Sequence, residues 1–302
     1  MKNLFHGKNQ YKGNLHMHTT VSDGTKSPEY AISIYKEAGY DFISITDHRV
    51  TSKGGEYEGM LLIPGAEWDN CRKKGGEVFH ILSIGTESDL GLSAYYKLSE
   101  PGKCDELSPE SVVARIKKAG GLAILAHPNW SLMDPADIKR VEGIDAVEIY
   151  NSVSAPPWNA DRADSSLYFD LWGTKGILLN CTASDDSHWY SGEETKSYTM
   201  IFADELSNEA VIAAIKSGNA YASRGPRFES VSYDEKKIEI KCSEDVERII
   251  VYSDAVWVNP RVFDHPCGKA IYDISPNDSC IRIELIDKEG RKAWTGTFGI
   301  KE

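Results

Sequence analysis

Histidine and carboxylate side chains recur where short apolar segments of this sequence end. His16 and His18 form a His-Met-His motif at the end of segment 13–17, and His127 follows segment 122–126. Six of the eight histidines follow or lie within such segments, with acidic residues beside them. The candidate set is His16, His18, Asp23, His48, Glu67, His80, His127, Asp186 and His188. Imidazole and carboxylate together suit Zn²⁺, Mn²⁺ or iron, so the set predicts a metal site.

The size of this set predicts more than one ion. Most ions take about four to six ligands. Nine candidate side chains therefore suit two or three divalent ions (Zn, Mn or Fe), with Glu67 as a bridging carboxylate. Residues two apart share one face of a strand while the strand continues, so His16 and His18 can act as a chelating pair.

Each candidate also has a structural explanation. Asp23 in Ser-Asp-Gly could belong to a turn, and Asp186 could cap a helix. His80 lies inside an apolar run and could be a hydrogen-bonded core residue. The conjunction of the nine residues favours the metal site over these separate explanations. His6 and His265 stand apart from the set, and we expect them on the surface.

Alternating strand and helix patterns up to about residue 222 must position these side chains. Ser27-Pro28 and Ser108-Pro109 are typical helix starts. Strands are expected at 13–17, 41–46, 122–126, 146–150, 177–181 and 198–202, and helices from 28, at 110–119, near 164–172 and at 208–217. This order predicts an α/β fold with a mainly parallel sheet, either a barrel or doubly wound. Carboxyl ends of parallel strands share one edge, where distant residues can converge.

The pattern changes around 222–227, where helical periodicity stops. Short alternating segments follow, such as 237–241, 248–252 and 280–286, and predict a small antiparallel β-sandwich. We therefore expect two domains, 1–226 and 227–302. Four aromatic residues of the second domain could form an exposed patch, although packing in the sandwich core is the default. They are Tyr252, Trp257, Trp294 and Phe298.

Composition narrows the classes of protein. A formal net charge of −12 argues against broad nucleic-acid binding, which needs a basic surface. No apolar stretch reaches the ~18–20 residues of a membrane helix, and residues 1–12 lack the apolar core of a signal peptide. The six cysteines form no Cys-x-x-Cys pair, and we expect them to be reduced. These features together predict a cytoplasmic protein without a membrane partner.

The ordered motifs resemble those of the polymerase and histidinol phosphatase (PHP) family of metal-dependent phosphoesterases. They are HMHTTVSDG, ITDH, PGAE, FHILSIG, AHP and SDDSH, and the resemblance covers roughly residues 12–226. Segments 147–151 and 218–223 also look like the two-domain members. The resemblance implies a distorted (β/α)7 TIM-like barrel with a di- or trinuclear site, and it places the family's ligands on the same nine residues. Asp23 stands where some members have histidine.

The chemistry of clustered divalent ions then suggests further roles. Such ions lower the pKa of bound water towards ~7 and stabilise charge on phosphoryl oxygens. Asp47 and Asp185 are candidate catalytic residues, either orienting a ligand or handling a proton. Candidates for substrate binding are Arg49, Arg162, Arg224 and Trp130. No basic residue directly follows His127-Pro128, where some nucleotide-cutting members of the family carry one.

The leading hypothesis is hydrolysis of a phosphoester by metal-activated water. Its substrate would be a small phosphorylated metabolite, a nucleotide such as a nucleoside 3′,5′-bisphosphate, or the end of a short oligonucleotide. One alternative is an amidohydrolase-like enzyme that cleaves a non-phosphate bond. Another is a binding or scaffold module with structural metals. The sequence leaves the oligomeric state and the role of the sandwich open.

Overall fold

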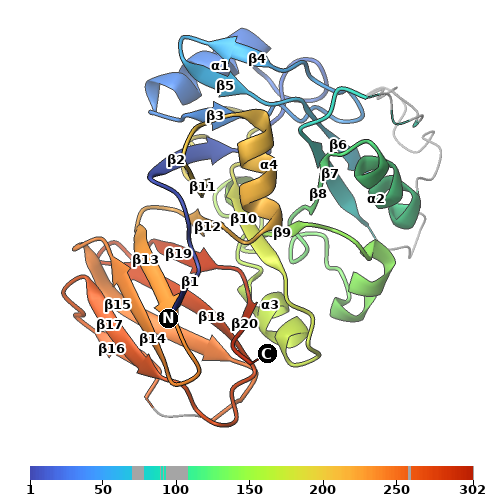
Figure 1. The fold of residues 1–302 in the computed structure, drawn as a ribbon. Helices are drawn as coiled ribbons and strands as arrows, with labels where there is room; N and C mark the ends of the chain where they lie inside the picture. Colours follow the sequence, from blue (N-terminus) through green and yellow to red (C-terminus); the bar gives the residue numbers. More distant parts are fainter. Residues whose placement is uncertain (70–77, 89, 91, 93–107, 258–259, 302) are drawn as a thin grey trace.

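The computed structural model describes residues 1–69, 78–88, 90, 92, 108–257 and 260–301. Its helices gather with the strands of the first two-thirds of the chain, and the last third is built of strands (Figure 1). The fold is therefore mixed α/β, as expected. None of the helices in the described part of the chain has the length and apolar character of a membrane span.

One five-stranded sheet, in the order β10-β9-β8-β7-β6, carries much of the first part. Its strands are β6 (Gly65–Asp69), β7 (His80–Ile84), β8 (Leu122–Leu125), β9 (Ala146–Asn151) and β10 (Asn180–Ser184). The β8–β9 and β9–β10 pairs are parallel, but β7 runs antiparallel to both β6 and β8. The expectation of a mainly parallel sheet is thus wrong, because β7 reverses the direction of the chain within the sheet.

A second sheet runs through both parts of the chain, in the order β16-β15-β18-β19-β12-β11-β2-β3-β5-β4, with β20 paired to β18. Its strands are β2 (Asn9–Asn14), β3 (Phe42–Ile43), β4 (Gly55–Tyr57), β5 (Met60–Leu62), β11 (Tyr198–Ala203), β12 (Ala220–Ser223), β15 (Val246–Ser253), β16 (Val262–Asp264), β18 (Cys280–Asp287), β19 (Lys292–Thr295) and β20 (Phe298–Gly299). Among the described residues of this sheet, only the β2–β3 and β3–β5 pairs are parallel.

The third sheet packs on the C-terminal strands of the second. It contains β1 (Lys2–Asn3), β13 (Phe228–Tyr233), β14 (Lys237–Cys242) and β17 (Lys269–Asp273), all antiparallel. Ile240 of β14 and Val251 of β15 belong to one buried apolar cluster between the two sheets, which form the expected sandwich. Trp294 is fully buried, but it packs in the core of the five-stranded sheet and not between the two sandwich sheets. Trp257 is 84% exposed, so the four aromatic residues do not share one exposed patch.

The helices begin where their capping residues predict. They are α1 (Pro28–Glu37), α2 (Pro109–Lys118), α3 (Ser166–Gly173) and α4 (Asn208–Lys216), with short 3₁₀ helices η1 (Pro135–Val141) and η2 (Ser152–Ser154). Ser27 accepts a hydrogen bond from the backbone N–H of Tyr30, and Ser108 accepts one from Ser111. Each serine thereby satisfies a backbone donor that the first turn leaves unpaired.

Two sheets approach each other at one edge without merging into a continuous ladder. Isolated parallel bridges join Met17 to Ser187 and His48 to Glu67. Met17, His48 and Ser187 lie beyond the ends of β2, β3 and β10, and Glu67 lies within β6. The described residues show no continuous ladder between the two sheets at this edge. A closed TIM-like barrel is therefore not confirmed. What the bridges do establish is that the ends of β2, β3, β6 and β10 meet.

Strands from both parts of the chain pair with each other in common sheets. The N-terminal strand β1 pairs with β13 of the sandwich, and β12 pairs with β19, so the large sheet crosses the predicted boundary at residue 226 (Figure 1). Nothing in this pairing tests the two-domain division, which stays a prediction.

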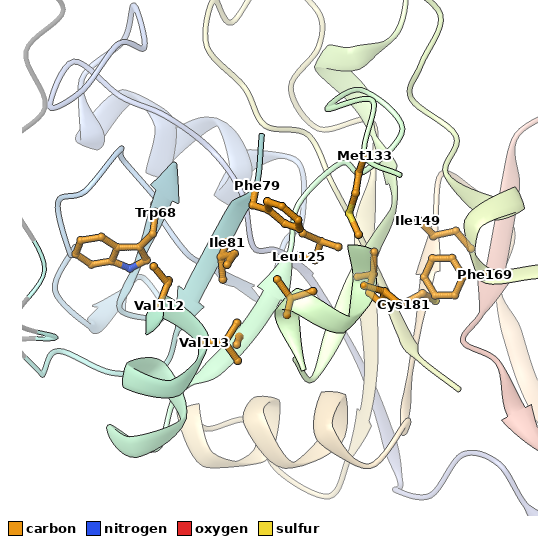
Figure 2. Close-up of a cluster of buried hydrophobic side chains, with 14 of the residues drawn as sticks. Trp68, Phe79, Ile81, Val112, Val113, Leu125, Met133, Ile149, Phe169 and Cys181 are labelled. Carbon is orange, nitrogen blue, oxygen red and sulfur yellow. The ribbon is translucent and has the colours of Figure 1, made fainter. Parts of the chain in front are cut away.

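The main apolar core of the first part lies between the five-stranded sheet and the helices that cover it. Figure 2 shows Ile81 and Leu125 on the strands facing Val112 and Val113 of α2, with Phe169 of α3 at the far end. Burial of such side chains stabilises the sheet by roughly 1.5–3 kcal/mol each. Of the cysteines, Cys181, Cys242, Cys267 and Cys280 are free, as expected, and Cys71 and Cys104 lie outside the described residues.

Candidate metal centre

The structure brings all nine predicted ligand residues to the edge where the strand ends meet. His16 and His18 follow β2, His48 follows β3, and Glu67 lies within β6. His127 follows β8, while Asp186 and His188 follow β10. His80 is the first residue of β7. Because β7 is antiparallel to its neighbours, its first residue lies at the edge where β6 and β8 end.

A central group is formed by two histidines and two carboxylates. Oε2 of Glu67 lies 3.3 Å from Nε2 of His16 and 3.1 Å from Nε2 of His18. Oδ1 of Asp186 lies 3.1 Å from each of the same two nitrogens. The two Nε2 atoms are themselves 3.3 Å apart. His16 and His18 thus face the same two carboxylates, as expected of a chelating pair, although both lie beyond the end of β2 and not within a strand.

Two further groups flank the central one. On one side, Oε1 of Glu67 lies 2.8 Å from Nδ1 of His80 and 3.5 Å from Nε2 of His127. Glu67 therefore faces two groups at once, as expected for a bridging carboxylate. On the other side, an outer group forms around Asp23, whose carboxylate oxygens lie 3.5–3.6 Å from ring nitrogens of three histidines. These are His18, His48 and His188.

The central group has the spacing that a bound ion requires. Ligand atoms held at ~2.1 Å by one tetrahedral or octahedral ion lie about 3.0–3.4 Å from one another. Each of the two Nε2 atoms lies 3.1–3.3 Å from both carboxylate oxygens and from the other Nε2. Oδ1 of Asp186 is also buried and has no hydrogen-bond partner among the described residues. A divalent cation would satisfy that oxygen, so the donor set fits a metal centre.

Opposing charges in the cluster shift the pKa of its members strongly. Burial lowers the pKa of His18, but the carboxylates of Asp186 and Glu67 outweigh burial and raise it to about 10. Burial raises the pKa of Glu67, but the neighbouring histidines hold it well below its ordinary value. The same competition lowers the pKa of Asp23 to about 2. Without ions, protons on the imidazoles balance the carboxylates, and bound cations would replace these protons.

Glu148 and Asn151 support the centre, although the sequence analysis assigned them no role. Glu148 is fully buried on β9, and its Oε1 lies 3.0 Å from Nδ1 of His16. Its Oε2 accepts hydrogen bonds from the backbone N–H of His127 and from Nδ2 of Asn151. Nδ2 of Asn151 also lies 3.2 Å from Oδ2 of Asp186. A charged residue in the otherwise apolar strand 146–150 was the signal that could have identified Glu148.

Asp47 and Asp185 are both engaged by donors from their own surroundings. Asp47 accepts hydrogen bonds from the backbone N–H and hydroxyl groups of Thr19 and Ser22, which holds the loop after His18 in place. Asp185 accepts from the hydroxyls of Tyr35 and Ser152 and from two backbone N–H groups. Burial raises the pKa of Asp185 to about 6. These bonds give both carboxylates a positioning role, and a part in proton transfer stays a prediction.

Of the predicted substrate-binding residues, Trp130 lies against the cluster. Its ring is 4.8 Å from that of His127 and 5.8 Å from that of His80. Arg49 is buried and donates to Asp69.

The remaining two substrate candidates are less directly placed. Arg224 stacks on the Tyr150 ring at 4.4 Å, and Arg162 is half-buried in the loop after η2. Trp189, which the sequence analysis did not select, is 44% exposed beside His188.

Comparisons with known proteins give the fold but little sequence similarity. No family model matches the chain. An uncharacterized protein of Methanocaldococcus jannaschii is 26% identical over 159 residues, which covers 47% of this chain and 82% of that protein.

Among solved structures, a two-domain protein from Bacteroides vulgatus, described as containing a predicted PHP-like metal-dependent phosphoesterase, superimposes with a TM-score of 0.50. It is 16% identical, and the match covers 98% of this chain and 99% of that one. An amidohydrolase from Chromobacterium violaceum gives a TM-score of 0.45 at 17% identity, over 60% of this chain and 89% of that one. The full-length match confirms, at the level of the fold, the resemblance to two-domain PHP-like proteins.

Proposed function

We propose that this chain, whose fold is similar to that of a two-domain protein containing a predicted PHP-like phosphoesterase, is a metal-dependent hydrolase that cleaves phosphoesters. The observation that carries the proposal is the central group of the metal centre. There two carboxylates and two imidazoles converge at 3.1–3.3 Å, and a buried Asp186 oxygen has no hydrogen-bond partner within the described chain. Its substrate would be a small phosphorylated metabolite, a nucleotide or an oligonucleotide end.

The nine clustered residues would hold two or three divalent ions, Zn²⁺, Mn²⁺ or iron. Such ions supply Lewis-acid stabilisation of phosphoryl oxygens and activate water for attack. Glu67 presents one oxygen to the central group and the other to the group of His80 and His127, which supports its bridging role. Trp130 borders this side of the centre, where its ring can position the substrate and limit access of water.

The contacts between the two sheets beside the metal centre support a barrel-like arrangement of the strands. Seven strands follow one another around the site: β2, β3, β6, β7, β8, β9 and β10. Ladders join them within the two sheets, and the bridges Met17–Ser187 and His48–Glu67 join the sheets to each other. We therefore interpret these strands as a distorted barrel, opened where single bridges replace continuous ladders.

Phosphate release by the Mn²⁺-loaded protein tests the proposal. The panel would contain a nucleoside 3′,5′-bisphosphate, mononucleotides, histidinol phosphate, sugar phosphates and a 5′-phosphorylated oligonucleotide. Asp186→Ala removes a carboxylate of the central group, and Asp273→Ala removes an exposed one on β17 as the matched control. We expect turnover by the native protein and the control, and its loss in Asp186→Ala.

Other outcomes would contradict the proposal in distinct ways. Hydrolysis of amides or lactones with no phosphate release, while ions are bound, would indicate a non-phosphate hydrolase. Unfolding on chelation without turnover of any substrate would indicate structural metals in a binding module.

A further inference from the structure

A tight loop follows the last histidine of the cluster and closes on Glu193. Glu193 is fully buried, although its neighbours Ser191 and Glu194 are not. Its Oε1 accepts hydrogen bonds from the backbone N–H groups of His188, Trp189 and Tyr190, at 3.2, 2.6 and 2.6 Å. Its Oε2 accepts from the N–H of Ser191 at 2.9 Å. Four consecutive backbone donors thus converge on one carboxylate.

Consecutive N–H groups that point to one spot form a nest, which binds an anion. Here the anion is a side chain of the same loop. Tyr190 adopts a φ of 53° and Gly192 a φ of 114°, and these positive angles turn the loop back on itself. The four N–H donors suit a carboxylate, which accepts at both oxygens.

The nest lies directly beside the outer group. The N–H of His188 points to Glu193, and Nδ1 of His188 lies 2.8 Å from the carbonyl oxygen of Asp186. These two contacts leave Nε2 of His188 directed at Asp23, 3.6 Å away. Tyr190, held by the same carboxylate, donates its hydroxyl to the carbonyl oxygen of His18 at 2.8 Å. The loop closed by Glu193 thus contacts two members of the outer group.

We propose that Glu193 is a positioning residue for the outermost metal ion, because its carboxylate holds the 188–191 loop in the one conformation that presents His188 to Asp23 and His48. This inference rests on the proposed function, in which the outer group holds an ion. Both the charge and the length of the side chain matter. Glutamine has one carbonyl oxygen, so its amide N–H₂ would face the N–H of Ser191. Aspartate is shorter by one methylene.

The test is equilibrium binding of Zn²⁺ to the full chain, with the bound metal counted by elemental analysis. Glu193→Gln should lower the affinity for one Zn²⁺ ion by about 10–100-fold, the range typical of residues that orient a ligand. The affinity for the other ions should not change. Glu194→Gln is the matched control, since Glu194 accepts one N–H, that of Gly192, from the same loop. It should bind Zn²⁺ as the native protein does. Glu193→Asp should fall between the native protein and Glu193→Gln.

A double-mutant cycle separates positioning from a general structural role. If Glu193 acts through His188, Glu193→Gln should cause no additional loss of Zn²⁺ affinity in a His188→Ala background. Additive losses, unchanged affinity in Glu193→Gln or unfolding of both Glu193 variants would overturn the inference. A native protein that binds no Zn²⁺ would instead overturn the proposed function. Native binding with an unaffected Glu193→Gln variant would overturn only the role of Glu193.

Discussion

Hydrogen bonds at Nδ1 decide which ring nitrogen several histidines present to the centre. Nδ1 lies 3.0 Å from Glu148 in His16 and 3.1 Å from the Ser131 hydroxyl in His127. Nδ1 of His18 faces both the Ser22 hydroxyl, at 3.3 Å, and Asp23 of the outer group, at 3.5 Å. In His188, Nδ1 contacts the Asp186 carbonyl. A partner on one nitrogen orients the ring and leaves the other nitrogen for a ligand bond. The buried hydroxyls and carboxylates around the cluster therefore belong to the site.

Because Glu148 orients the ring of His16, Glu148→Gln should weaken metal binding. The change leaves the volume of the side chain nearly unaltered but removes the charge that faces Nδ1 of His16. Affinity for Mn²⁺ should fall by about 10–100-fold in a calorimetric titration. Glu142→Gln, on an exposed turn, is the matched control and should bind normally. Equal affinity of the two variants would contradict a supporting role for Glu148.

The raised pKa of His18 predicts how pH affects stabilisation by ions. His18 titrates near 10 in the metal-free folded protein and near 6.5 when unfolded. Its proton therefore stabilises the metal-free fold fully below about pH 6.5, and this contribution is lost as the pH rises through about 10. A metal ion binds only the neutral imidazole of His18. At higher pH fewer protons occupy this ring, so the ion binds more readily.

The increase in Tm on adding Mn²⁺ should thus be larger at about pH 8 than at about pH 6. Thermal unfolding with and without Mn²⁺ at both pH values measures this difference. The metal-free protein at each pH is its own control. A larger increase at the lower pH would contradict the assignment of His18 as a ligand.

Among the elements, helix α1 is attached to the site through one hydroxyl. Tyr35 is fully buried on α1, and its Oη lies 2.8 Å from both the Asp185 carboxylate and the Ser187 hydroxyl. Asp185 in turn accepts from Ser152 of η2. Packing of α1 against the sheet and the position of the 185–188 segment are therefore coupled.

Tyr35→Phe should destabilise the metal-free protein by about 1–3 kcal/mol, because it leaves buried polar atoms of Asp185 and Ser187 with one partner fewer. Urea unfolding measures the loss. Tyr30→Phe on the same helix is the matched control, since Tyr30 is 43% exposed, and it should change stability by less than about 0.5 kcal/mol. Similar losses in both variants would show that the Tyr35 hydroxyl contributes no specific stability.

In the whole molecule, an ion pair between a buried arginine and a half-buried aspartate joins the sandwich to helix α3. Arg282 of β18 donates Nε and one Nη to the two oxygens of Asp170, each at 2.9 Å, and its guanidinium lies over the Tyr252 ring. Arg282 is 2% exposed. Together with the β12–β19 pairing, this contact makes the two parts of the chain stabilise each other.

Arg282→Met should cost about 3 kcal/mol of unfolding free energy, since it removes the buried cation that faces both Asp170 and the buried carboxylate of Glu284. Arg248→Met breaks the exposed Arg248–Asp264 pair and should cost less than about 1 kcal/mol. Denaturant unfolding of the metal-free variants compares the two. We expect one cooperative transition in the native protein, because strands cross the predicted boundary. Two separate transitions, or equal costs for the two arginines, would contradict this coupling.

The convergence of the nine candidate residues, the starts of α1 and α2 and the sandwich could be predicted from the sequence. Each depends on short-range patterns: residue types at strand ends, Ser-Pro pairs, and alternating apolar residues. The direction of β7 could not be predicted, because strand direction depends on which edge a strand pairs with. The sequence analysis did not select Glu148 or Glu193, although the charge of Glu148 within an apolar strand was a signal for the first. Their partners are backbone and side-chain groups that only the folded loops bring within reach.

The sequence alone determined which chemistry this protein can carry, since the types of its side chains decide which ions and reactions they suit. It also determined most elements, because capping and periodicity act within a few residues. Tertiary structure decided how Glu67 faces two groups at once, why His80 belongs to the set, and that one sheet runs through both parts of the chain. These features depend on pairing between distant segments. Such pairing is selected by the packing of the whole molecule rather than by any local pattern.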